Sequence, residues 1–310
     1  MRIAVMAAGA VGGYFGARLA DAGHDVTFFA RGAHLAAIRN NGLKIESALG
    51  DLHLTSVNVT DDPASVAPVE IVLFAVKLWD LETAAQSLRP LIGPSTQVIT
   101  LQNGIDAVER AAPILGADHV AGGTAQIATV IEAPGVIKHT SKISIIRCGR
   151  LDRRADPTLT AFVAAGTKAG FDIALSDDIE RDLWVKFVML VGMSGITAST
   201  GEPIGRILAD PDTRAMYLAL MQEVVNVGRT KGVKLAADLA QERLQVVETT
   251  FPAGMKASMA HDLERGNRLE LDWLAGRVVQ LGRALGVPTP ANDAVYAVLK
   301  LHRMGRSRPG

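Results

Sequence analysis

The sequence predicts an α/β fold, in which an N-terminal Rossmann-type doubly wound sheet is followed by an all-helical C-terminal domain. Up to about residue 176, short apolar runs of strand length alternate with helical patterns, which is typical of a parallel sheet covered by helices. Beyond that point only helical periodicity remains, and glycines and prolines interrupt it. We therefore expect two domains, over residues 1–176 and 177–310, with the boundary near Ser176.

Composition narrows the class of protein. The chain has 310 residues, 48% of them hydrophobic, which suffices for two domains. Lys plus Arg and Asp plus Glu both number 32, so no net charge favours nucleic acid or an anionic membrane. Cys148 is the single cysteine, so we expect no intrachain disulfide and no cysteine-based metal site. The seven histidines form no metal-like cluster, so we expect no metal site of another kind. No apolar run reaches the length of a membrane span, and we expect a cytoplasmic protein without membrane association.

The first 30 residues have the pattern strand, tight turn, helix, strand. Ile3–Met6 is an apolar run suited to a buried strand, and a helical pattern then ends at Gly23 before a second strand over Val26–Ala30. Such a unit places a pyrophosphate at the N-terminus of its helix. The small residues between strand and helix are therefore the candidate cofactor-binding turn: Ala7, Ala8, Gly9, Ala10, Val11 and Gly12.

The glycine fingerprint in this turn is imperfect. The pattern G-x-G-x-x-G falls on Ala7, Gly9 and Gly12, so alanine replaces the first glycine, which is acceptable if its φ is negative. Gly9 lets the backbone approach the phosphates, and Gly12 lets the helix pack on the strand. The position directly after a strand predicts dinucleotide binding; the alternative is a glycine-rich contact without a ligand.

The end of the second strand selects the cofactor. NAD sites place an acidic residue there to bind the ribose, whereas this chain has Arg31. A guanidinium suits a 2′-phosphate, which it can bind with two hydrogen bonds, so NADPH is favoured. The alternative is a solvated surface arginine.

The remaining elements of the N-terminal domain follow in order. A short helix over Leu35–Ile38 precedes a hairpin whose strands are Leu43–Glu46 and Leu52–Val59. Further along we expect a strand over Ile71–Val76, a helix over Leu81–Leu88 and a strand over Gln97–Leu101. Three polar side chains directly follow strands, and we expect them to converge beyond the carboxyl ends of the sheet: Arg31, Lys77 and Asn103.

Antiparallel strands and then helices complete the chain. Strands are expected over Ile127–Glu132, Val136–Thr140 and Ile143–Arg147, with Pro134–Gly135 as a turn. A helix over Pro157–Lys168 and a strand over Phe171–Ala174 follow, and Ser176, Asp177 and Asp178 supply capping side chains. The helices predicted beyond them cover about 179–198, 211–230, 236–250, 271–285 and 290–304, and we expect Arg303–Gly310 to be a frayed, solvated tail.

In this order the motifs resemble those of a known family, the ketopantoate reductases (2-dehydropantoate 2-reductases), over nearly the whole chain. The residues that carry the resemblance are the AGAVG turn, Arg31, Val76–Lys77, Gln102–Asn103–Gly104, Leu183–Trp184–Val185–Lys186, Ser258–Met259, Asp262 and Glu270–Leu271–Asp272. The resemblance implies reduction of a 2-oxo acid to a 2-hydroxy acid by NADPH.

The resemblance also implies roles for individual residues. Lys186 would be the general acid, and Glu270 would hold the cofactor or orient Lys186. Asn103 would contact both the nicotinamide and the substrate, Lys77 would line the cofactor crevice, and Ser258 would bind the substrate. A small-molecule 2-oxo acid is then the expected partner, and a homodimer stays open.

The chemistry of ketone reduction agrees with these roles. Hydride addition builds negative charge on the carbonyl oxygen, which an ammonium can stabilise and then protonate. Lys186 lies among apolar residues, where desolvation would lower its pKa toward the working range. The alternatives are a helix lysine that extends its head to solvent, and for Glu270 an acidic residue at a helix N-terminus.

The chain departs from the family pattern at the substrate-holding positions. The family has asparagines four and eight residues after the lysine, on one helix face, and this chain has Leu190 and Ser194 there. Leu269 also replaces a threonine before the glutamate. The substrate-binding set that the resemblance implies is therefore Asn103, Lys186, Leu190, Ser194 and Ser258, and we expect the far end of the pocket to be more apolar.

Two classes of function stay open from the sequence. The first is an NADPH-dependent reductase, acting on ketopantoate in pantothenate biosynthesis or on a more apolar 2-oxo acid. The second is a non-catalytic NADP-binding sensor. A sensor needs neither Lys186 nor Glu270, so their presence favours the enzyme.

Overall fold

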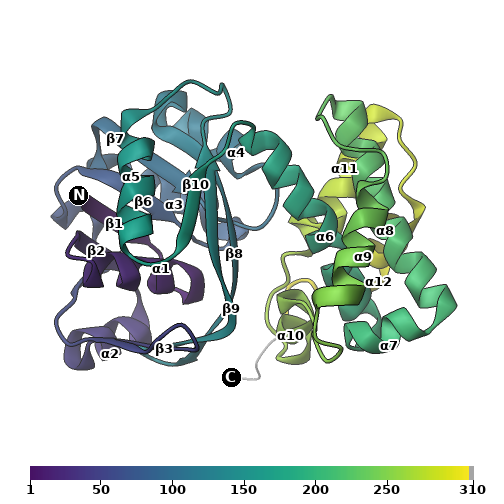
Figure 1. Ribbon diagram of the computed structural model, residues 1–310, viewed down its shortest axis with the longest axis horizontal. Coiled ribbons are helices and arrows are strands. Elements are labelled where there is room, and N and C mark those ends of the chain that lie inside the picture. The colour runs from purple at the N-terminus through teal and green to yellow at the C-terminus, as the bar shows by residue number, and fades with distance from the viewer. Residues whose placement is uncertain (307–310) are drawn as a thin grey trace. The chain divides into compact units, whose positions relative to one another are not determined.

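The computed structural model describes residues 1–306 and divides into two compact units (Figure 1). Unit 1 comprises Met1–Gln102 and Asp106–Asp182, whereas unit 2 comprises Asn103–Ile105 and the residues from Leu183 onward. Unit 1 is α/β and unit 2 is helical, which confirms the predicted fold class. The domain boundary near Ser176 stays a prediction.

Unit 1 contains a mixed sheet of ten strands with the order β4-β3-β9-β8-β7-β6-β1-β2-β5, and β10 pairs with β9. At its centre β1 lies between β2 and β6, parallel to both, with Met6 opposite Phe29 and Phe74. The bounds are β1 (Arg2–Met6), β2 (Asp25–Phe29), β3 (Leu43–Ser47), β4 (Leu52–Leu54), β5 (Asn58–Thr60), β6 (Val69–Phe74), β7 (Ile92–Thr100), β8 (Val120–Ala133), β9 (Val136–Gly149) and β10 (Asp172–Leu175).

Helices cover both faces of the parallel strands. Alternate residues of β6 such as Ile71 and Leu73 join the core cluster shared with α1, α2 and α5. Val72 and Phe74, which point to the other face of the sheet, are equally buried. Burial on both faces explains why these strands are continuous apolar runs. The helices are α1 (Ala10–Asp21), α2 (Gly32–Asn41), α3 (Leu81–Ser87), α4 (Ala107–Leu115) and α5 (Pro157–Lys168).

The stretch predicted as one strand over Leu52–Val59 is two strands on opposite edges of the sheet. β4 pairs antiparallel with β3, whereas β5 pairs parallel with β2. The chain from Leu54 to Asn58 reaches at most about 14 Å. Nine strands side by side in a flat sheet would hold its edges roughly 38 Å apart. The sheet must therefore curl strongly.

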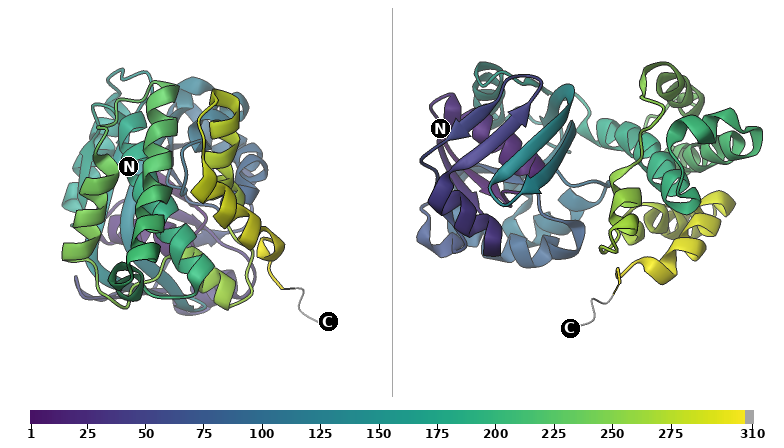
Figure 2. Two further views of the ribbon diagram at one scale, coloured as in Figure 1. Left: turned by 90° about the vertical axis from the view of Figure 1, so that its right-hand side faces the viewer. Right: turned by 90° about the horizontal axis from the view of Figure 1, so that it is seen from below.

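The region predicted as three antiparallel strands is one long hairpin, β8–β9 (Figure 2, teal). Pro134–Gly135 is the turn, as predicted, and Gly135 has φ of +79°. The polar residues near Thr140 do not end the strand. Pairing between β8 and β9 continues past them, with a shift in register between Ile127 and Thr129.

Helix α4 was not expected from the sequence. Its interior contains Pro113, which cannot donate a backbone hydrogen bond and argues against a helix. The helix forms nonetheless, with Ala107, Val108, Ala111 and Leu115 buried on one face. Tertiary packing of that face outweighs the local penalty.

Unit 2 is built from long helices that run side by side (Figure 2, left). The crossing of α6 and α8 is close at two glycines: a Cβ on Gly192 would lie 2.7 Å from the Tyr217 ring, and one on Gly228 would lie 2.7 Å from the Trp184 ring. The bounds are α6 (Ile179–Thr200), α7 (Ile204–Ala209), α8 (Pro211–Lys231), α9 (Leu239–Thr250), α10 (Ser258–Glu264), α11 (Ala275–Leu285) and α12 (Pro290–Leu299). The short helices α7 and α10 were not predicted.

Two expectations about unit 2 need correction. By length and composition α6 could cross a membrane, contrary to the expectation that no run has that length; 67% of its most apolar window is buried inside the protein, as in a core helix. The tail is also not frayed throughout. Leu269 N–H donates to the Arg303 carbonyl and Arg306 N–H donates to the Gly266 carbonyl, both at 2.9 Å. Residues 307–310 lie outside the described part.

Candidate functional site

The glycine turn between β1 and α1 has the geometry of a phosphate cradle. A Cβ on Gly9 would meet nothing within 4 Å, so the backbone is open to a close ligand. A Cβ on Gly12 would lie 2.5 Å from the Ala7 carbonyl oxygen, so only glycine lets the helix approach the turn. Within residues 1–306, Arg153 is the single non-glycine residue with positive φ, so Ala7 meets its condition. The first backbone N–H groups of α1 lack partners within the helix and suit a pyrophosphate.

Arg31 directly follows β2, the strand beside β1. It is the N-cap residue of α2, and its exposed side chain has no hydrogen bond or ion pair within the described part of the chain. The next residue, Gly32, has φ of +55°, which turns the chain from the strand into the helix. The guanidinium is therefore available to an anionic group.

Lys77 follows β6, the strand on the other side of β1. It is exposed, begins the short helix η2 (Leu78–Asp80), and holds its ammonium 5.6 Å from the centre of the Trp79 ring. Arg110 of α4 donates to the Leu78 carbonyl at 2.7 Å and to both carboxylate oxygens of Glu82. This clamp fixes the segment after Lys77, and sequence reasoning missed it along with α4.

The candidate catalytic residues of unit 2 lie around Lys186 of α6. Its ammonium donates to the Asn103 amide oxygen at 3.2 Å, across 83 positions of sequence. Burial lowers the pKa of Lys186 to about 8, and the carboxylate of Glu270 opposes this by favouring the charged form. A lysine with such a pKa can hold and release a proton near neutral pH.

Glu270 is buried at 6% exposure and precedes the short helix η5 (Leu271–Trp273) as its N-cap residue. The sequence left open whether this acid serves only a helix N-terminus. Its carboxylate favours the charged form of Lys186, and burial strengthens that effect because water does not screen it. The role of Glu270 stays a prediction.

The two positions at which the chain departs from the family pattern lie further along α6. Ser194 is 1% exposed, and its hydroxyl has no hydrogen-bond partner within residues 1–306. Leu190 is half-buried and packs against the core of unit 2. Ser258 is exposed at the first turn of α10. The hydroxyl of Ser194 thus remains free for water or a ligand.

Two hydroxyls that follow Ser194 along α6 form hydrogen bonds with the backbone. Thr197 Oγ1 donates to the Met193 carbonyl at 2.6 Å and accepts from Ala257 N–H at 3.3 Å. Ser199 donates to the Gly195 carbonyl at 2.7 Å. Thr197 thereby holds the residue before Ser258, a contact between positions 60 apart that no sequence pattern signals.

The predicted site residues therefore fall into two groups. Residues 7–12, Arg31 and Lys77 surround the carboxyl end of β1 in unit 1. Asn103, Lys186, Leu190, Ser194, Ser258 and Glu270 belong to unit 2. Their assigned roles and the expected convergence of Arg31 and Lys77 with Asn103 stay predictions. Within the described residues no three His, Cys, Asp or Glu side chains gather into a metal site.

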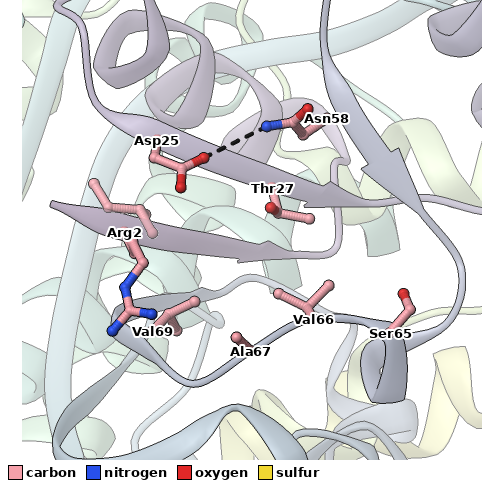
Figure 3. Close-up of a pocket in the computed structure, with 9 residues that line it drawn as sticks. Arg2, Asp25, Thr27, Asn58, Ser65, Val66, Ala67 and Val69 are labelled. Carbon is pink, nitrogen blue, oxygen red and sulfur yellow. Dashed lines mark hydrogen bonds between the residues drawn. The ribbon is translucent and has the colours of Figure 1, made fainter.

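A separate pocket of about 260 Å³ lies at the amino ends of the strands (Figure 3). Four of its lining residues, Arg2, Asp25, Asn58 and Val69, are the first residues of their strands. Ligands of doubly wound sheets bind at the carboxyl ends instead. The carboxylate of Asp25 already accepts a hydrogen bond from Asn58. We assign no role to this pocket.

Comparison with known proteins covers both units. Residues 3–153 match the family described as "Ketopantoate reductase PanE/ApbA", and residues 178–303 match "Ketopantoate reductase PanE/ApbA C terminal". A 2-dehydropantoate 2-reductase from Mesorhizobium japonicum is 32% identical, with 97% of each chain covered.

Solved structures of ketopantoate reductases are also similar to this chain. A PanE/ApbA family ketopantoate reductase from Ralstonia eutropha is 33% identical with a TM-score of 0.88, and 98% of each chain is covered. A 2-dehydropantoate 2-reductase from Geobacter metallireducens is 30% identical with a TM-score of 0.91, covering 97% of this chain and 99% of that one.

Proposed function

Since this chain belongs to the ketopantoate reductase family, NAD(P)-dependent oxidoreductases that act on CH–OH groups, we propose that it reduces a 2-oxo acid to a 2-hydroxy acid with NADPH. The observation that carries this proposal is the Lys186–Asn103 pair at 3.2 Å, with the pKa of Lys186 lowered to about 8. Ketopantoate or a close relative is the substrate, which gives the enzyme a role in pantothenate biosynthesis in the cytoplasm.

Lys186 acts as the general acid. When bound, the reduced nicotinamide supplies a hydride to the carbonyl carbon of the substrate. The Lys186 ammonium stabilises the negative charge that develops on the substrate oxygen and then donates a proton to it. Asn103 orients the ammonium through its amide oxygen, and the carboxylate of Glu270 keeps the lysine charged before the proton is needed.

The preference for NADPH rests on Arg31. Its exposed side chain has no partner within the described residues, and it directly follows the strand whose end carries an acid in NAD sites. The open backbone at Gly9 and the close packing at Gly12 support binding of the pyrophosphate at the start of α1.

Leu190 favours a second candidate, a 2-oxo acid with a larger apolar side chain. It cannot form a hydrogen bond with a substrate hydroxyl, and Ser194 has a shorter reach than the family's asparagine. The unpartnered Ser194 hydroxyl leaves one polar contact for the substrate.

A panel of 2-oxo acids tests the proposal. We expect NADPH oxidation with formation of the matching 2-hydroxy acid, identified by mass spectrometry. Higher kcat/KM for apolar acids than for ketopantoate would favour the second candidate. A preference for ketopantoate over every apolar acid would favour the plain ketopantoate reductase. NADPH binding without turnover on any acid would favour a sensor.

A further inference from the structure

His34, in the first turn of α2, connects the glycine turn to the tip of the β8–β9 hairpin. Its Nε2 lies 2.8 Å from the Ala8 carbonyl oxygen, and Gly135 N–H donates to its Nδ1 at 3.1 Å. A carbonyl can only accept and a backbone N–H can only donate. Hence Nε2 carries the hydrogen, and both ring nitrogens are committed to the backbone.

The same turn of α2 carries Arg31. Arg31 is the N-cap residue, and His34 follows three positions later, a spacing that places two residues on one side of a helix. The bond from His34 to Ala8 therefore ties the start of α2 to the candidate cofactor-binding turn. Because the Arg31 side chain has no partner of its own in residues 1–306, the position of its guanidinium depends on how α2 is held.

The hairpin tip supports His34 from the other side. A Cβ on Gly135 would lie 3.2 Å from the Ala37 Cβ, so the tip packs directly against α2. Lys44 N–H donates to the Gly135 carbonyl at 2.9 Å, which anchors the tip to the start of β3. The imidazole thus joins the glycine turn to a hairpin tip that is itself anchored to β3.

We propose that His34 is a positioning residue that sets the preference for NADPH over NADH. By holding α2 to the Ala8 carbonyl, it fixes the distance between Arg31 and the glycine turn. NADPH must contact Arg31 with its 2′-phosphate and the glycine turn with its pyrophosphate at the same time, whereas NADH has no 2′-phosphate. Loosening α2 therefore lowers the affinity for NADPH more than the affinity for NADH. The inference rests on the proposed role of Arg31.

Titration of both cofactors by tryptophan or nicotinamide fluorescence tests the inference. His34→Leu removes both bonds of the imidazole and should lower the ratio of NADPH to NADH affinity by about ten-fold. This is the loss expected when the charged hydrogen bond between Arg31 and the 2′-phosphate is weakened, and the affinity for NADH should change little. His34→Gln keeps one donor and one acceptor and should retain most of the ratio. In an Arg31→Ala background, His34→Leu should not lower the ratio further, because the two changes remove the same interaction.

His53, in strand β4, provides a matched control because it contacts the same helix. Its Nε2 lies 2.8 Å from the carbonyl oxygen of Asn41, the last residue of α2. His53→Leu removes a similar bond at the end remote from Arg31 and should leave the ratio unchanged. An equal fall of the ratio in His53→Leu would show general loosening and overturn the role of His34.

The outcomes separate this inference from the proposed function. Equal affinity of the wild type for both cofactors would refute the NADPH assignment itself. A wild-type preference that Arg31→Ala abolishes but His34→Leu and His34→Gln both keep would refute the role of His34 alone. If His34→Leu does not fold, His34→Gln and His34→Asn decide, since His34→Asn is too short to reach both partners and should lower the ratio.

Discussion

The pH dependence of reduction tests the assignment of Lys186 and Glu270 most sharply. With a pKa of about 8, roughly nine-tenths of Lys186 carries a proton at pH 7 and roughly one-tenth at pH 9. If the ammonium is the general acid, kcat/KM for reduction should fall about ten-fold between these values. With a lysine at its ordinary pKa of 10.5, kcat/KM would fall by less than about 10% between pH 7 and pH 9.

Glu270→Gln supplies the perturbation. The carboxylate raises the pKa of Lys186, so its removal must lower that pKa, and the midpoint of the rate profile should move below 8. The oxidation of the 2-hydroxy acid needs the neutral amine, so its profile should rise with pH where the reduction profile falls. Stopped-flow measurement of single turnovers between pH 6 and about 10 separates chemistry from product release.

Asp272→Asn is the matched control. Asp272 lies two residues beyond Glu270 and accepts a hydrogen bond from Tyr296 at 2.9 Å, so its loss should leave the midpoint near 8. A wild-type profile that stays flat to pH 9, or a midpoint that rises in Glu270→Gln, would contradict the reasoning.

Three further predictions follow from the same structure. Lys186→Ala should keep NADPH binding and lower kcat by about 10²–10⁴-fold, measured by steady-state kinetics beside a cofactor titration; a wild-type rate would exclude its role as the acid. Leu190→Asn combined with Ser194→Asn should move kcat/KM toward ketopantoate relative to apolar 2-oxo acids, and an unchanged ratio would mean that these positions do not contact the substrate. Glu223 accepts from the backbone N–H groups of Ala291 and Asn292 at 2.7 and 2.9 Å, so Glu223→Ala should lower the free energy of unfolding by about 2–4 kcal/mol in urea, whereas a change below about 0.5 kcal/mol would contradict this capping role.

Local patterns predicted the elements that carry their own signal. β1 and the strands beside it are apolar runs because both of their faces are buried, and the helix after the glycine turn has regular apolar spacing. The motif around Lys186 was visible because its residues are consecutive. Asp178 also caps α6 as predicted, accepting a hydrogen bond from Arg181 N–H.

What the sequence did not reveal depends on partners distant in the chain. The split of Leu52–Val59 follows from the choice of neighbouring strand, which residue periodicity does not encode. Pro113 concealed α4 because local propensity and tertiary packing disagree there. The bonds of His34 to Ala8 and of Thr197 to Ala257 join residues 26 and 60 positions apart, so no local pattern reports them.

Transfer of deuterium tests the central claim most directly. NADPH carrying deuterium at C4 of the nicotinamide, incubated with a 2-oxo acid and the wild-type protein, should yield the 2-hydroxy acid with deuterium at C2. Lys186→Ala should bind the same cofactor and form little of this product. Product without deuterium at C2 after both C4 faces have been labelled in turn, or no product from any 2-oxo acid, would contradict the claim that this chain is a 2-oxo acid reductase.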